Sequence, residues 1–113
     1  MRVLIADNLP TGIRSSLAEL GCEVDFQPGL GVEDLAAALQ DANVLIVRST
    51  KVTREAIESA RNLQFIVRAG AGTNTIDCAA AAAHGIYVSN CPGKNAVAVA
   101  ELTMGLILSL DRR

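Results

Sequence analysis

Aromatic residues are scarce in this sequence. Only 3% of the 113 residues are aromatic, tryptophan is missing altogether, and 50% are hydrophobic. A core without large rings has to be built from Val, Ile, Leu and Ala, which are typical of buried parallel strands covered by helices. The chain is long enough for one domain with its own core and too short for two.

Cysteine and histidine are too few and too far apart to predict a metal site. Cys22, Cys78 and Cys91 form no C-x-x-C pair, and His84 is the only histidine. A zinc site needs more ligands at closer spacing, so we expect no bound metal. An odd number of separated cysteines is typical of reduced thiols, and the sequence therefore favours a cytoplasmic protein.

Charge of one sign is not concentrated anywhere in the chain. The 10 basic and 12 acidic residues give a formal net charge of -2, and the basic residues are dispersed. This pattern predicts neither a nucleic-acid partner nor an acidic membrane surface. Met1-Arg2 leads directly into an apolar strand with no long hydrophobic region after it, so we expect no signal peptide and no membrane partner.

Short apolar runs alternate with segments of helical periodicity along most of the chain. Gly21 and Gly85 follow two of the helical segments, where a left-handed cap is usual. We expect strands at 2–6, 23–27, 43–47, 65–67 and 86–88, and helices at 10–20, 32–39, 53–60 and 77–83.

The strands differ in how they alternate polar and apolar residues. Val44-Leu45-Ile46-Val47 is unbroken and predicts a central strand, whereas Val24 and Phe26 alternate with polar neighbours and predict an edge strand. Five βα units in succession predict an α/β fold with an open parallel five-stranded sheet and helices on both faces. The default strand order for that pattern is the flavodoxin-like 2-1-3-4-5.

A loop with two glycines predicts an anion-binding site. The stretch Phe65–Asp77 reads F-I-V-R-A-G-A-G-T-N-T-I-D, which indicates a strand, a tight loop and the start of a helix. In a parallel α/β sheet such a loop lies at the carboxyl edge, where ligands bind. Gly70 and Gly72 let backbone N–H groups approach a ligand, and Arg68 adds a fixed cation. A sharp turn beside a solvated arginine explains the same residues, because short glycine motifs are weakly specific.

The last segment is apolar on nearly every side. Residues 96–110 read A-V-A-V-A-E-L-T-M-G-L-I-L-S-L, with Glu101 as the only charge. A surface helix keeps a polar face, and this helix is shorter than the roughly 20 residues of a membrane span. We therefore expect it to pack on this domain with one face and on another domain or a second copy of the chain with the other.

Three separated motifs resemble those of one enzyme family. They are V-R-S-T-K-V-T at 47–53, V-R-A-G-A-G at 67–72 with Ile76-Asp77, and N-C-P-G-K-N at 90–95 followed by V-A-E-L-T at 99–103. In this order and across the whole chain, they resemble the D-isomer-specific 2-hydroxyacid dehydrogenases. The resemblance implies an NAD-dependent oxidoreductase acting on a small phosphorylated 2-hydroxyacid. It also implies that residues 1–94 belong to a substrate-binding domain, and that 95–113 form a hinge and dimerisation helix, giving a homodimer or higher homo-oligomer.

The resemblance further implies roles for single residues. Arg48 and Arg68 are similar to the cations that hold a substrate phosphate, and guanidinium groups suit that task. Ser49 is expected to support them by hydrogen bonding. The loop whose backbone N–H groups meet the substrate carboxylate is similar to Ala69, Gly70, Ala71 and Gly72.

Three further positions follow from the same resemblance. Asn90 matches an asparagine at the mouth of the family's interdomain cleft. Val99 lies where the connecting helix approaches the nicotinamide ring, and Ala71 stands where a threonine hydroxyl often touches the cofactor. Because alanine has no hydroxyl, Ala71 is expected to approach NAD without a side-chain hydrogen bond.

Several groups that the family needs for turnover are absent from these 113 residues. There is no G-x-G-x-x-G fingerprint, since Thr75 stands where the third glycine would follow Gly72. His84 precedes Gly85 at the end of a helix and matches no catalytic position, which favours a structural role. We therefore expect no catalytic residue in the chain, NAD held mainly by a further Rossmann domain, and no activity from the chain alone.

Alternatives from other classes differ in the residues that they require. A signalling receiver domain shares this length and strand order but needs an aspartate at the end of the third strand, where this sequence has Arg48-Ser49. Two alternatives stay open. One is a relative acting on glyoxylate or hydroxypyruvate, and the other is a free-standing, non-catalytic binding or dimerisation module.

Overall fold

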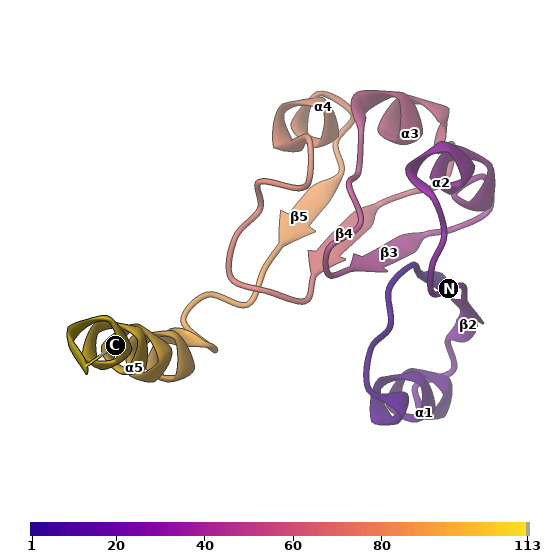
Figure 1. Cartoon of the computed structure of the whole chain (residues 1–113). Helices are drawn as coiled ribbons and strands as arrows, with labels where there is room; N and C mark the ends of the chain where they lie inside the picture. Colours follow the sequence, from indigo (N-terminus) through magenta and orange to yellow (C-terminus); the bar gives the residue numbers. More distant parts are fainter. Residues whose placement is uncertain (113) are drawn as a thin grey trace.

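The computed structural model describes residues 1–112. Strands and helices alternate along the chain, as the sequence predicts (Figure 1). The strands are β1 Arg2–Ile5, β2 Glu23–Phe26, β3 Val44–Val47, β4 Phe65–Arg68 and β5 Tyr87–Ser89. The helices are α1 Thr11–Glu19, α2 Val32–Ala38, α3 Arg54–Ser59, α4 Cys78–Ala83 and α5 Ala96–Arg112.

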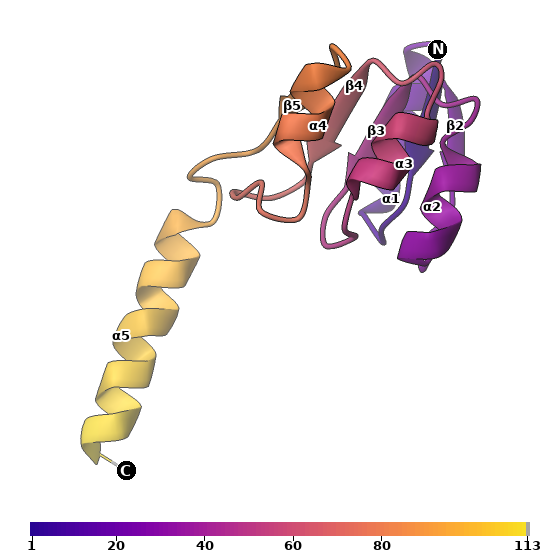
Figure 2. The ribbon, with the colours of Figure 1, turned by 90° about the horizontal axis from the view of Figure 1, so that it is seen from above.

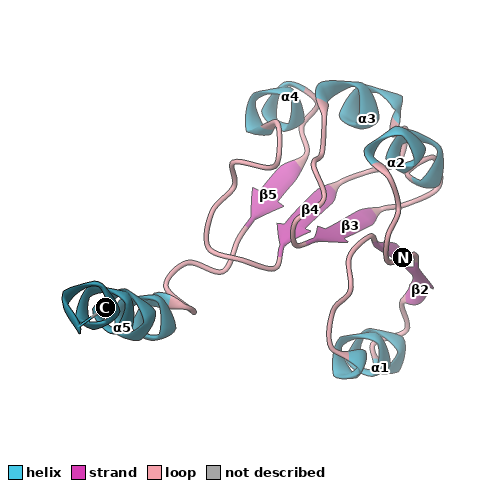
Figure 3. Ribbon diagram, viewed as in Figure 1, coloured by secondary structure: helices cyan, strands magenta, loops and turns pink. Residues whose placement is uncertain are grey.

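The five strands form one parallel sheet in the order β2-β1-β3-β4-β5, which confirms the predicted topology (Figure 3). In the centre Leu4 of β1 pairs with Leu45 of β3, and Leu45 in turn pairs with Ile66 of β4. Each of these three residues is at most 1% exposed. The unbroken apolar run of β3 thus occupies the middle of the sheet, while the alternating β2 lies at an edge.

Helices cover the two faces of the sheet unequally. Helices α2, α3 and α4 lie side by side on one face, and α1 lies on the other (Figure 1). The larger core cluster includes Leu35 of α2, Ile57 of α3 and Ala80 of α4. The smaller cluster packs Ile13 and Leu17 of α1 against the opposite face of β1, β2 and β3. The prediction of helices on both faces is therefore confirmed.

Glycine caps place the starts of β2 and β5. Gly21 and Gly85 have φ of 82° and 69°, in the left-handed region that glycine adopts without a Cβ clash. The Ile86 N–H donates to Ala81 O at 2.9 Å, which closes α4 in a Schellman motif. Because Ile86 completes this cap, β5 begins at Tyr87, one residue later than the sequence predicts.

The last helix departs from the sequence prediction. Every residue of α5 from Ala96 to Arg112 is exposed, and the helix projects away from the sheet (Figure 2). The expectation that α5 packs one face on this domain is therefore wrong for the described residues. The connection from β5 turns outward at Gly93, whose φ is 72°, and carries the helix away from the core. Within residues 1–112 no helix is both long and apolar enough to cross a membrane.

Candidate functional site

Three loops at the carboxyl edge of the sheet enclose a cavity of about 610 Å³. They follow β3, β4 and β5, which are neighbours in the sheet, so residues distant in the sequence meet there. The lining residues are Arg48, Arg68, Ala69, Gly70, Ala71, Gly72, Cys91, Lys94 and Asn95. Three of them are cations, and none of this lining set is acidic. The cavity therefore has the composition of an anion site.

Arg68 ties two of these loops together. Its Nε donates to Arg48 O at 3.0 Å, and its Nη1 donates to Gly72 O at 2.9 Å. A guanidinium group has five N–H donors in a fixed planar fork, so Arg68 keeps further donors for a ligand. The side chain thus fixes the loop geometry and also presents a cation to the cavity.

Gly70 is needed because the Arg68 guanidinium lies directly over it. A Cβ added at Gly70 would be 2.6 Å from Arg68 Nη1 and 2.9 Å from Cζ. Real Cβ atoms do not approach other heavy atoms so closely, so the Arg68 guanidinium would have to shift from its observed position. The first glycine of the loop therefore makes room for a protein side chain.

In the loop after β4, some backbone N–H groups donate hydrogen bonds within the protein and others do not. Ala69 N–H donates to Val47 O at 2.7 Å, and Gly70 N–H donates to Arg68 O at 2.9 Å. Within residues 1–112, the N–H groups of Ala71 and Gly72 have no protein acceptor. Two successive free N–H groups beside cations make an anion-binding concavity. Of the four predicted loop residues, Ala71 and Gly72 supply the free donors.

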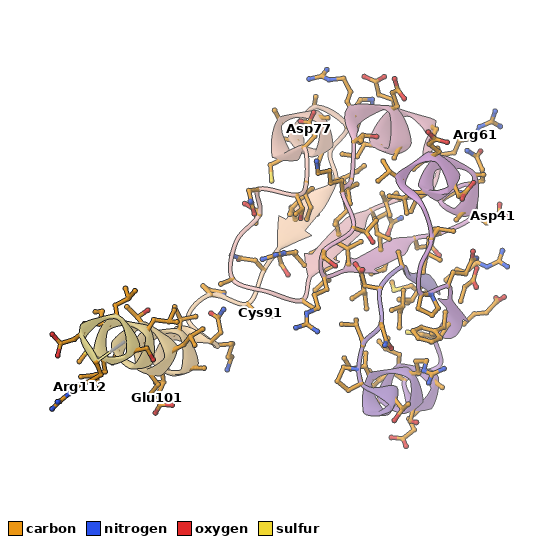
Figure 4. The ribbon with its side chains drawn as sticks, in the orientation of Figure 1. Asp41, Arg61, Asp77, Cys91, Glu101 and Arg112 are labelled. Carbon is orange, nitrogen blue, oxygen red and sulfur yellow. The ribbon has the colours of Figure 1, made fainter. Side chains whose placement is uncertain are left out.

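The segment after β5 holds this loop from its other side. The side-chain amide of Asn90 donates to Ala71 O, and Cys91 N–H donates to Gly70 O at 2.8 Å. Figure 4 shows Cys91 on the connection between the sheet and α5. Asn90 lies next to the cavity but does not line it. It therefore positions the loop, and its predicted place at the mouth of a cleft stays a prediction.

Asp7 organises the loop after β3. Its Oδ2 accepts from the N–H groups of Arg48 at 2.6 Å, Ser49 at 3.1 Å and Thr50 at 3.1 Å. Partial burial alone would raise the pKa of the Asp7 carboxyl, but the hydrogen bonds outweigh burial and lower the pKa below its usual value. The carboxylate thus holds the loop that carries Arg48.

Ser49 and Val99 lie outside the cavity lining. Ser49 Oγ donates to Asp7 Oδ1 at 3.3 Å, so its hydrogen bond supports the loop, and its predicted role towards a substrate stays a prediction. Val99 lies on α5 and is 52% exposed. Its predicted approach to a cofactor stays a prediction.

Sequence reasoning missed Lys94, Asn95 and Cys91 as lining residues. The third motif, at 90–95, contains all of them, but motif matching singled out Asn90 alone. The dispersal of basic residues along the sequence concealed that Lys94 joins Arg48 and Arg68 in the cavity lining.

The single histidine lies away from the cavity. His84 Nδ1 is 2.9 Å from Ala80 O, at the end of α4, and the residue does not line the cavity. Among the residues that the structure describes, no group of three His, Cys, Asp or Glu side chains gathers where it could hold a metal ion.

Comparisons with known proteins identify relatives of this chain. A family profile described as D-isomer specific 2-hydroxyacid dehydrogenase, catalytic domain, matches residues 3–105. The D-3-phosphoglycerate dehydrogenase of Methanocaldococcus jannaschii is 46% identical over 113 residues, covering 99% of this chain and 21% of that protein. The Homo sapiens enzyme of the same name is 44% identical with the same coverage.

A solved structure shares the fold. The NAD+-bound 3-phosphoglycerate dehydrogenase of Entamoeba histolytica superposes with a TM-score of 0.85 at 35% identity, covering 95% of this chain and 38% of that one. This chain spans 21% of the length of the two D-3-phosphoglycerate dehydrogenases. The family profile and the relatives agree along nearly all of its length, and the chain belongs to the D-isomer specific 2-hydroxyacid dehydrogenase family.

Proposed function

We propose that the chain is the substrate-binding part of an NAD-dependent D-3-phosphoglycerate dehydrogenase. In the complete enzyme, a hydride passes from C2 of 3-phosphoglycerate to NAD and the hydroxyl proton is released, giving 3-phosphooxypyruvate and NADH. In this proposal the reaction is the entry step of phosphorylated serine biosynthesis, and the protein acts in the cytoplasm. The identity to enzymes of that name supports the proposal.

One observation carries the choice of substrate. Arg48 and Arg68 line the same cavity as the free N–H groups of Ala71 and Gly72. A phosphate suits guanidinium groups, and a carboxylate suits paired backbone N–H groups. A ligand with an acidic group at each end, such as 3-phosphoglycerate, uses both halves of the site.

NAD would supply the hydride acceptor, and in this proposal Ala71 and Val99 approach it. Ala71 lines the cavity, and Val99 is 52% exposed on α5. Both side chains are small and apolar, so they fit the flat face of a nicotinamide ring without competing for hydrogen bonds. In this proposal most of the coenzyme contacts come from a further Rossmann domain, and the 113 residues alone do not turn over substrate.

We further propose that the protein is a homo-oligomer assembled through residues 95–110. The apolar side chains of α5 are exposed along its whole length, and an apolar surface of this kind favours association with a second copy.

An amide NMR titration tests the substrate proposal. The chain is titrated with 3-phosphoglycerate, and with glycerate as the control lacking phosphate. We expect shifts at Arg48, Ser49 and Ala69–Gly72, and tighter binding of the phosphorylated acid. Equal affinity for the two acids would contradict the phosphoglycerate assignment and favour a relative acting on glyoxylate or hydroxypyruvate. No binding of either at millimolar concentration would contradict an anion site in this chain and favour the non-catalytic module.

A further inference from the structure

We propose that Lys94 is a specificity residue of this site, and that it binds the phosphate end of the ligand together with Arg48. The inference rests on the proposed function, because it assigns a residue to the phosphate. It adds a cation that belongs to the third motif, at 90–95, but was not among the residues expected from the sequence to hold the ligand. It also distinguishes the three cations of the cavity, because Arg68 already donates hydrogen bonds to Arg48 O and Gly72 O, whereas within the described residues Arg48 and Lys94 do not use their charged groups in this way.

The backbone around Lys94 is fixed close to the loop after β4. Asn90 and Cys91 both donate hydrogen bonds to that loop, at Ala71 O and Gly70 O. Gly93, with φ of 72°, then reverses the chain, and Ala96 N–H donates back to Gly93 O at 3.2 Å. Lys94 therefore belongs to a short turn that begins at an anchored residue. Its presence in the cavity lining follows from this turn.

The Lys94 charge is not used within the protein. Arg2 pairs with Glu23 and Asp41, and Arg54 pairs with Glu58 and Asp77, but neither arginine lines the cavity. Within residues 1–112, neither the Lys94 ammonium nor the Arg48 guanidinium has a hydrogen-bond or ion-pair partner. Two cations that line one cavity and have no partner in the described chain are available to bind the same anion.

The two free cations suit a phosphate better than a carboxylate. A phosphate monoester carries about -1.5 to -2 charges at neutral pH and three acceptor oxygens, so it can bond two cations at once. A single carboxylate is satisfied by the N–H groups of Ala71 and Gly72. Loss of Lys94 is therefore expected to weaken phosphorylated ligands selectively.

The test compares Lys94→Met with wild type for 3-phosphoglycerate and glycerate. Calorimetry or NMR titration at low ionic strength gives both dissociation constants. A solvent-screened ion pair is worth up to about one kcal/mol, so we expect about a three- to fivefold loss for 3-phosphoglycerate. We expect less than a twofold change for glycerate, and recovery of most of the loss in Lys94→Arg.

Lys51→Met is the matched control, because Lys51 is an exposed lysine on the neighbouring loop that does not line the cavity. If Lys94→Met and Lys51→Met behave alike towards 3-phosphoglycerate, the inference is wrong and the proposed function stands. If wild type binds the two acids equally, the proposed function fails, and the inference fails with it. Amide spectra of the ligand-free variants confirm that each is folded.

Discussion

Arg68 contributes to the candidate site both as a structural side chain and as a cation. Its bonds to Arg48 O and Gly72 O span the loops after β3 and β4. Lysine could not replace it, because a single ammonium lacks the planar fork that reaches two carbonyls in fixed directions. Any loss of ligand binding after mutation of Arg68 therefore combines a lost cation with a displaced loop. Arg48, whose guanidinium has no partner in the described part of the chain, reports the phosphate contact more directly.

Gly70→Ala tests the structural role of Arg68. The new Cβ would lie 2.6 Å from Arg68 Nη1, so the guanidinium would move and lose both carbonyl partners. At about 0.5–1.5 kcal/mol for each hydrogen bond, reduced by solvent exposure, we expect a loss of about 1–2 kcal/mol in the free energy of unfolding. Urea denaturation measures it. Gly12→Ala is the control, since nothing lies within 4 Å of its added Cβ in α1, and it should stabilise the chain slightly.

The same variant also reports on the ligand. With Arg68 displaced, the free N–H groups of Ala71 and Gly72 lose their fixed direction. We expect weaker binding of both 3-phosphoglycerate and glycerate, unlike the selective loss expected for Lys94→Met. Gly70→Ala with unchanged stability and unchanged affinity for both acids would show that the guanidinium does not hold the loop.

At the scale of elements, the loop after β3 is held in place by Asp7, which follows the end of β1. Asp7 accepts hydrogen bonds from the three backbone N–H groups of residues 48–50. The side chain of an N-cap residue binds the free N–H groups of a helix in the same way. Hydrogen bonds to a charged acceptor are about twice as strong as neutral ones. Position 7 therefore controls where Arg48 stands, although nothing in its own sequence context indicated this role.

Asp7→Asn should lower stability in a pH-dependent way. The folded-state pKa of Asp7 lies below the ordinary value of 3.8, so its stabilisation is present above that pH and is lost as pH falls through the lower folded pKa. We expect Asp7→Asn to cost about 1 kcal/mol at pH 7, and the difference from wild type to shrink below about pH 4. Urea midpoints at several pH values measure it.

The control for this prediction is Asp41→Asn. The Asp41 side chain is 75% exposed and contacts Arg2 at 3.5 Å, so its removal should change the unfolding free energy little at any pH. A difference between Asp7→Asn and wild type that stays constant from pH 7 to pH 3 would contradict the proposed role of the Asp7 charge.

The sequence predicted the elements because their signals are local. The apolar run of β3 and the glycine after α1 each act within a few residues, and each has its expected place. The N-caps of α3 and α4, Thr53 and Asp77, are equally local, since they accept from the N–H groups of Ala56 and Ala80. The site was predicted in part, because motifs identify residues but not their contacts. The Arg68 bond to Arg48 O, the Asp7 bonds to the loop and the approach of Lys94 all depend on the packing of separate strands. Periodicity and spacing contain no information about such contacts.

For the whole molecule, α5 is the element that the domain leaves without packing. Its apolar composition predicted a buried helix, but every residue of α5 is exposed in the described part of the chain. In proteins most of the stability of a helix comes from packing of its apolar face, so we expect the 17-residue α5 to be stabilised by packing elsewhere. A surface of another chain or of a further domain would supply that packing.

Assembly through α5 gives the last prediction. The large apolar side chains of the helix are 52% to 80% exposed, and they include Leu102 and Leu106, one turn apart on the same face. We expect light scattering of the chain to give at least twice its 11.8 kDa. Leu102→Gln with Leu106→Gln should shift the mass towards the monomer. Leu20→Gln, at a side chain 80% exposed beside α1, should leave it unchanged. A monodisperse wild-type monomer would show that α5 does not join two copies, and would assign its apolar surface to a further domain instead.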